Sequence, residues 1–265
     1  MLLTVDIGNS HITLGGFEQE SLLFVANLLT CPYRTEDQYA VELLQIMNLH
    51  CAELKDVDGI VISSVVPEVC APIQRAFLHI CGVQPLLLGP GVKTGLNILI
   101  DNPAQLGSDM VASAVAAIAK YPLPCVIFDL GTAITVSFLD QKGSFLGGMI
   151  CAGVNIMLHA LTTQTALLPH ISLENPDHFI GKNTVQSMQS GLLYGTAAML
   201  DGLAARFATE LHEPPTLIAT GGMAHLITQN CVSPFLVDKH LLLDGLRLIY
   251  EKNRKNPKLP RSKQG

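Results

Sequence analysis

The sequence predicts an α/β protein built from two copies of one βββαβαβ unit. The stretch Thr4–Gly16 (TVDIGNSHITLGG) leads an apolar strand into Asp-apolar-Gly, a small polar residue and a second strand, and Phe128–Ser137 (FDLGTAITVS) repeats this order. Hydrophobic residues make up 49% of the chain and charged residues only 14%, which is typical of proteins with well-buried strands. At 265 residues, the chain is long enough for two domains with separate cores.

In the first half, hydrophobic periodicity predicts three strands, a helix and then further strands and helices in alternation. We expect strands at 2–7, 11–17 and 21–28, a helix at 36–49, a strand at 59–66, a helix at 68–81 and a strand at 84–89. Tyr39, Leu43, Leu44 and Met47 form one apolar face of the first of these helices. The Gly- and Pro-rich segment 89–103 predicts connecting structure.

The second half repeats the pattern after a helix expected at 104–120. We expect strands at 125–129, 133–139 and 144–150, helices within 153–165 and 184–209, a strand at 215–220, a short helix from Gly222, a strand at 232–237 and a last helix to about 250. A repeat of this length predicts two domains, at 1–117 and 118–252, followed by a basic flexible tail at 253–265.

Composition excludes several classes of function. The net charge is −6, and because the last residues from Glu251 hold six basic residues and one acid, the rest of the chain carries −11. Nucleic acid is therefore not an expected partner. No apolar run is long enough for a membrane span, and Asp6 follows Met1 too closely for a signal peptide, so we expect a cytoplasmic protein. The seven cysteines include no CxxC pair and are expected to be free thiols.

The repeated hairpin has the composition of a phosphate-binding loop. Glycine lets the backbone approach a ligand, and the small polar residue after it offers donors to an anion. An aspartate beside phosphate oxygens requires a cation such as Mg²⁺ between them. Two such hairpins facing each other across a cleft between the domains would hold the phosphates of a nucleotide from both sides. For either hairpin alone, an ordinary tight β-turn is the alternative.

A third glycine cluster, Ala219–His225 (ATGGMAH), lies between an expected strand and an expected helix. Its glycines would allow a flat ligand to lie against the backbone at the start of the helix. This position predicts the nucleoside end of the site.

These motifs together resemble the superfamily of acetate and sugar kinases, heat-shock chaperones and actin. Over nearly its whole length the chain is similar to type III pantothenate kinases, through the segments 101–117 (DNPAQLGSDMVASAVAA), 147–169 (GGMICAGVNIMLHALTTQTALLP) and 180–207 (IGKNTVQSMQSGLLYGTAAMLDGLAARF). The resemblance implies two actin-like (ribonuclease H-like) domains and ATP-dependent phosphorylation of pantothenate to 4′-phosphopantothenate, the first step of coenzyme A synthesis. It also implies a homodimer that requires Mg²⁺ and a monovalent cation, K⁺ or NH₄⁺.

The resemblance also implies roles for individual residues. A Gly-x-Asp-Arg segment binds pantothenate in that family and its aspartate is the base, and the matching positions here are Gly107, Ser108, Asp109 and Met110. Asp129 matches the monovalent-cation site, Thr132 an ATP contact and Thr184 a substrate contact. The ATP-binding first loop corresponds to Asp6, Ile7, Gly8, Asn9, Ser10, His11, Ile12 and Thr13, with Asp6 also a candidate Mg²⁺ ligand.

Some of these residues have structural alternatives. Phosphoryl transfer needs a carboxylate near the attacking hydroxyl, and Asp109 at the start of an apolar helix suits that task. The same position also suits an aspartate that only stabilises the helix dipole. Asp6 could be a turn former, Asp129 the partner of a buried lysine, and Thr184 a helix cap.

Three positions depart from the family pattern. Met110 stands in place of arginine, Ile100 in place of a frequent tyrosine and Ala152 in place of proline. A charge-assisted hydrogen bond to the carboxylate of pantothenate is worth roughly 1.5–3 kcal/mol, so its loss predicts binding about ten- to hundred-fold weaker. The alternatives are an ATP-binding regulatory paralogue without turnover and a kinase for another small hydroxyl compound.

Overall fold

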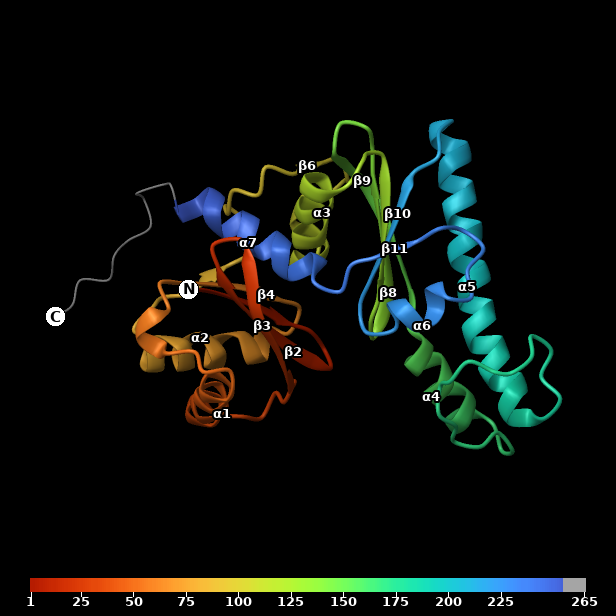
Figure 1. Ribbon diagram of the computed structural model, residues 1–265, viewed down its shortest axis with the longest axis horizontal. Coiled ribbons are helices and arrows are strands. Elements are labelled where there is room, and N and C mark those ends of the chain that lie inside the picture. Colours follow the sequence, from red (N-terminus) through yellow and green to blue (C-terminus); the bar gives the residue numbers. More distant parts are fainter. Residues whose placement is uncertain (255–265) are drawn as a thin grey trace. The chain divides into compact units, whose positions relative to one another are not determined.

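The computed structural model describes residues 1–254 as two compact units, each built on one mixed β-sheet (Figure 1). Among the described residues, the first unit holds Met1–Gly95, Ala104–Ala116 and residues 242–254. The second unit holds Leu96–Pro103 and Ala117–Leu241. Within residues 1–254, no helix has the length and apolar character needed to cross a bilayer.

The first unit contains a five-stranded sheet in the order β3-β2-β1-β4-β5. Its strands are β1 (Leu2–Ile7), β2 (His11–Glu18), β3 (Ser21–Leu29), β4 (Gly59–Ser64) and β5 (Leu86–Leu87). Strands β1, β2 and β3 form an antiparallel meander, whereas β4 runs parallel to β1. The carboxyl ends of β1 and β4 therefore meet at one edge of this sheet, which places Asp6 beside Ser63.

Helices cover both faces of this sheet. Leu3, Val5 and Ile7 of β1 pack with α1 (Glu36–Leu49) and α2 (Pro67–Cys81) in one buried cluster. Figure 1 shows α1 and α2 side by side beneath the strands. On the opposite face, α7 (Leu241–Arg254) packs against the strands, with the Arg247 guanidinium 5.9 Å from the centre of the Phe17 ring.

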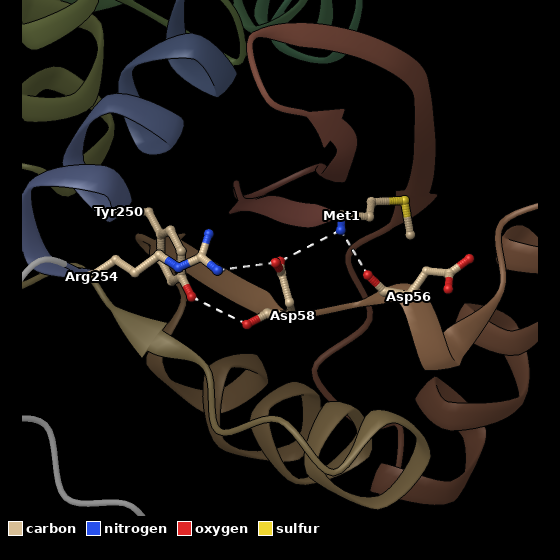
Figure 2. Close-up of polar contacts among 5 residues, drawn as sticks. All are labelled: Met1, Asp56, Asp58, Tyr250 and Arg254. Atoms are coloured by element: carbon tan, nitrogen blue, oxygen red, sulfur yellow. Dashed lines mark hydrogen bonds and ion pairs between the residues drawn. The ribbon is translucent and has the colours of Figure 1, made fainter.

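Polar contacts attach the end of α7 to the first unit (Figure 2). Arg254 Nη2 lies 3.2 Å from Asp58 Oδ2, and the Tyr250 hydroxyl donates to the Asp58 carbonyl at 3.4 Å. The α-amino group of Met1 donates to the Asp56 carbonyl at 2.7 Å and lies 3.5 Å from Asp58 Oδ1. The Asn253 side chain accepts a hydrogen bond from the Lys93 N–H at 3.2 Å and donates one to the Lys93 carbonyl at 2.9 Å.

These contacts differ from the sequence-based division of the chain. The last helix was expected in a domain at 118–252, but it packs in the first unit and includes Asn253 and Arg254 of the expected tail. The rest of that expected tail, 255–265, lies outside the described residues.

The second unit contains a six-stranded sheet in the order β11-β10-β7-β8-β9-β6. Its strands are β6 (Asn97–Ile98), β7 (Cys125–Leu130), β8 (Ala133–Leu139), β9 (Ser144–Ala152), β10 (Thr216–Thr220) and β11 (Leu236–Val237). Its helices are the last turn of α3 (Ser108–Lys120), α4 (Val154–Gln164), α5 (Thr184–Leu211) and α6 (Ala224–Thr228). Apolar residues of β7, β8 and β10 pack against α5 and α6 in a second buried cluster.

Three elements differ from expectation for identifiable reasons. Strand β6 forms inside the expected connecting segment because Asn97 and Ile98 pair with the start of β9. Strand β11 is shorter than 232–237 because the N–H groups of Val232 and Ser233 bond to the Asp201 carboxylate instead of a neighbouring strand. The helix expected from 104 begins at Ser108, after a separate 3₁₀ turn at Pro103–Gln105.

The Asp238 carboxylate joins the end of α3 to the residues after β11. Oδ2 accepts hydrogen bonds from Lys120 Nζ at 2.6 Å and the Tyr121 hydroxyl at 2.8 Å, and Oδ1 accepts from the His240 N–H at 3.0 Å. Burial alone would raise the pKa of this carboxyl, but the three hydrogen bonds outweigh burial and hold the pKa below its usual value.

We expect Asp238→Asn to lower the free energy of unfolding by about 1.5–3 kcal/mol at pH 7, because charge-assisted hydrogen bonds are lost. Since the folded-state pKa is the lower one, the stabilisation is complete above about pH 4 and is lost as the pH falls through the folded value. The difference between wild type and variant should therefore shrink below about pH 4 in denaturant titrations. Asp177→Asn, at an exposed loop carboxylate, is the control; equal effects of both variants would contradict the assignment.

Candidate active site

The first hairpin loop, residues 8–11, joins β1 to β2. The Gly8 N–H donates to the His11 carbonyl at 3.0 Å, which leaves Asn9 and Ser10 exposed at the tip. Asp6 lies in β1 opposite Thr13 of β2 and is partly exposed. The structure thus brings together, in one hairpin, all eight residues expected to form the first phosphate loop.

The start of α3 presents the Asp109 carboxylate. The Gly107 carbonyl accepts the first helical hydrogen bond, from the Val111 N–H at 3.1 Å, so Asp109 lies in the first turn. Asp109 Oδ1 accepts from the Met110 N–H at 2.8 Å. A Cβ atom on Gly107 would lie 2.3 Å from Asp109 Oδ1, so glycine is required for this carboxylate position.

Ser108 attaches this helix start to β4. Its hydroxyl lies 2.9 Å from Ser63 Oγ, accepts from the Ser64 N–H at 3.1 Å and lies 3.2 Å from the Ser64 carbonyl. Because Ser63 is beside Asp6 in the sheet, Asp6 and Asp109 belong to the same edge of the first unit. Sequence reasoning assigned Ser108 to substrate binding and missed this link, because only the strand order brings Ser63 and Ser108 together.

The second hairpin loop, residues 131–133, joins β7 to β8, and the Gly131 N–H donates to the Ala133 carbonyl at 3.2 Å. Gly153, at the start of α4, packs directly against this loop: a Cβ atom there would lie 2.1 Å from the Thr132 carbonyl oxygen and 2.5 Å from that of Gly131. Sequence reasoning noted Gly153 only as part of a family motif and missed this contact.

The third glycine cluster also packs against the second hairpin loop. Gly221 has a φ of +89°, and a Cβ atom there would lie 2.5 Å from Asp129 Oδ1. The Met223 N–H donates to the Leu130 carbonyl at 3.0 Å. The ATGG segment and Asp129 therefore form one local structure in the second unit.

The surroundings of Asp129 contain oxygen ligands suited to a hard cation. Its strand pairs with β10 so that Thr220 lies beside it, and backbone carbonyls of the hairpin loop are close by. Carboxylate, hydroxyl and carbonyl oxygens are the ligand types that such cations prefer. Within residues 1–254, no three His, Cys, Asp or Glu side chains form a group that could hold a metal ion.

Thr184 is the first residue of α5 and is exposed. The helix cap is Asn183, whose side chain accepts from the Gln186 N–H at 2.9 Å. The alternative in which Thr184 caps this helix is therefore wrong. Thr184 belongs to the second unit, whereas residues 107–110 belong to the first.

Comparison with protein families gives a match over most of the chain. Residues 2–206 match the family model described as type III pantothenate kinase. A protein named type III pantothenate kinase from an Exiguobacterium species is 42% identical over 255 residues, covering 96% of this chain and 100% of the relative. One of the same name from a Geobacillus species is 40% identical over 253 residues, covering 96% and 98%.

Comparison with solved structures shows the fold. The activator of 2-hydroxyisocaproyl-CoA dehydratase from Clostridium difficile, with bound ADPNP, superposes with a TM-score of 0.54 at 12% identity, covering 98% of each chain. The ROK hexokinase from Thermus thermophilus gives 0.50 at 14% identity, covering 95% of this chain and 99% of its own. The expected actin-like fold is confirmed.

We expect Gly153→Ala to weaken binding of a non-hydrolysable ATP analogue about ten- to hundred-fold in calorimetry. The added methyl group would displace the second hairpin loop, because its carbonyls already touch Gly153, and overpacking of this kind costs about 1–3 kcal/mol. Gly202→Ala, on an exposed face of α5 where a Cβ atom meets nothing within 4 Å, is the control and should leave affinity unchanged. Equal affinity of a folded Gly153→Ala variant would refute the role of this contact.

Proposed function

The chain belongs to the type III pantothenate kinase family, and from this premise we propose which residues perform the reaction. The enzyme uses ATP to phosphorylate pantothenate to 4′-phosphopantothenate in coenzyme A biosynthesis. Similarity at 40–42% identity over nearly the full length favours this activity over a regulatory paralogue or a kinase for another hydroxyl compound. The observation that carries the residue assignment is the Asp109 carboxylate, held over Gly107 at the start of α3.

Asp109 acts as the catalytic base in this proposal. Its Oδ1 accepts the Met110 N–H, while among the described residues no protein group donates to Oδ2. Oδ2 can therefore accept the proton of the pantothenate hydroxyl while the hydroxyl oxygen forms a bond to the γ-phosphorus of ATP. The bond between that phosphorus and the bridging oxygen breaks, and ADP leaves.

The two hairpin loops bind ATP. The first loop is Asp6 through Thr13, with Asn9, Ser10 and His11 exposed at its tip, and the second contributes the exposed Thr132. Backbone N–H groups at such strand ends suit phosphate oxygens. Mg²⁺ is commonly held by one or two carboxylates together with substrate phosphates, and Asp6 at the first loop fits that role. When bound, the ion would neutralise charge on the transferred phosphoryl group.

Pantothenate binds through Gly107, Ser108, Asp109, Met110 and Thr184. Because the Ser108 hydroxyl is already bonded to β4, Ser108 offers the acceptor its backbone rather than its side chain. The exposed Thr184 side chain is available as a hydrogen-bonding group.

Asp129 holds the monovalent cation, K⁺ or NH₄⁺, and the oxygen atoms around it support this assignment. Equal activity with K⁺ and with Na⁺ would contradict this assignment.

The enzyme acts as a cytoplasmic homodimer. Exposed apolar residues of the second unit, including Ile150 at 76% and Ile180 at 75% exposure, support a contact between copies. A monomer in light scattering at micromolar concentration would refute the dimer, and cell fractionation checks the location.

We expect Asp109→Asn to lower kcat by about 10²–10⁴, because the amide cannot accept the proton of the hydroxyl. Affinity for ATP should change little, since Asp109 does not contact the nucleotide in this proposal. A coupled assay of ADP release, with ATP affinity measured by calorimetry, checks both expectations. Unchanged kcat would reduce Asp109 to a residue that only stabilises the helix start.

We expect Met110→Arg to lower the KM for pantothenate about ten- to hundred-fold, because the guanidinium restores a charged donor for the substrate carboxylate. The KM for ATP should stay unchanged. Met110→Leu, which changes shape without adding charge, is the matched control. Equal pantothenate KM values for all three proteins would show that this position does not contact the carboxylate.

A further inference from the structure

We propose that Thr30 is a positioning residue that fixes the first hairpin loop in its ATP-binding conformation. This inference rests on the proposed role of residues 6–13 in binding ATP and extends it to a residue outside the loop. Thr30 follows β3 directly, and nothing in its local sequence marks it as functional.

Thr30 holds two carbonyl groups of the hairpin loop. Its hydroxyl donates to the Gly8 carbonyl at 2.7 Å, and its backbone N–H donates to the Ser10 carbonyl at 3.0 Å. The loop's own closing hydrogen bond runs from the Gly8 N–H to the His11 carbonyl. Thr30 is therefore bonded to the peptide groups on both sides of the exposed tip.

Holding the carbonyl of a peptide unit also fixes the direction of the N–H in the same unit. In a planar trans peptide, the N–H points away from the carbonyl of the same unit. With the Gly8 carbonyl held toward Thr30, the Asn9 N–H points to the opposite side. The Ser10 carbonyl is bonded to the Thr30 N–H and is likewise held toward the end of β3. Two oxygens that would repel a phosphate are thus turned away, and the Asn9 N–H is presented to it.

The segment after Thr30 is itself firmly held. The Cys31 carbonyl accepts from the Tyr39 hydroxyl at 2.8 Å and from the Arg34 N–H at 3.2 Å. Tyr39 belongs to α1 and its residue is fully buried. Thr30 lies between this anchor and β3, so it can hold the hairpin loop in place rather than move with it.

The test compares Thr30→Val with Thr30→Ser in the full-length enzyme. Valine keeps the shape and the backbone N–H but removes the hydroxyl, whereas serine keeps the hydroxyl. We expect Thr30→Val to raise the KM for ATP about tenfold, on the scale of one lost hydrogen bond, with the KM for pantothenate within about twofold of wild type. Thr30→Ser should restore the KM for ATP.

Thr209→Val is the matched control, because the Thr209 hydroxyl also donates to a backbone carbonyl, that of Ala205 at 2.9 Å, but far along α5. It should leave both KM values unchanged. Three results would overturn the proposal: an unchanged KM for ATP in Thr30→Val, a parallel rise of both KM values with a lower Tm, or no recovery in Thr30→Ser. If instead the wild-type enzyme fails to bind ATP, the proposed function fails and the inference with it.

Discussion

A hairpin loop can bind an anion only if its carbonyl oxygens are held away from the ligand, and both hairpins of this chain meet that constraint by different means. In the first, Thr30 lies outside the loop and donates hydrogen bonds to two of its carbonyls. In the second, the carbonyls of Gly131 and Thr132 lie against Gly153, where no side chain intervenes. Gly221 allows the same close approach at Asp129. The ATP binding proposed for the enzyme depends on these backbone positions, whereas the proposed proton transfer depends on Asp109.

At the start of α3, a glycine again allows a close contact, here with the Asp109 carboxylate. Gly107 leaves space for a carboxylate oxygen, while the Ser63–Ser108 hydroxyl pair holds the helix to the strand beside β1. Asp109, the proposed base, and the first hairpin loop are therefore positioned by one sheet edge. A kinase benefits from this arrangement, because small displacements between a base and a phosphate site reduce the rate of transfer steeply.

Most of the regular structure follows from local patterns in the sequence. The strands of both βββ meanders and the helices at 36–49 and 68–81 carry strong hydrophobic periodicity, and the paired Asp-x-Gly motifs indicate the repeat. What could not be predicted depends on contacts between distant residues. The bonds of Asp201 to Val232 and Ser233, the link from Ser63 to Ser108 and the contact of Thr30 with the hairpin loop have no local signal. The cap of α5 was misassigned by one residue, since Asn183 and Thr184 are both favourable caps and only the backbone conformation decides between them.

Because α7 belongs to the first unit, that unit cannot be completed until the end of synthesis. The first unit consists of three separate segments, and the last of them begins at Leu242. A nascent chain leaving the ribosome therefore completes the second unit before α7 can pack against the sheet that was synthesised first. Until then, the surface around Gly15, Phe17 and Gly59 stays uncovered, so the part of the molecule that is synthesised first is the last to be completed.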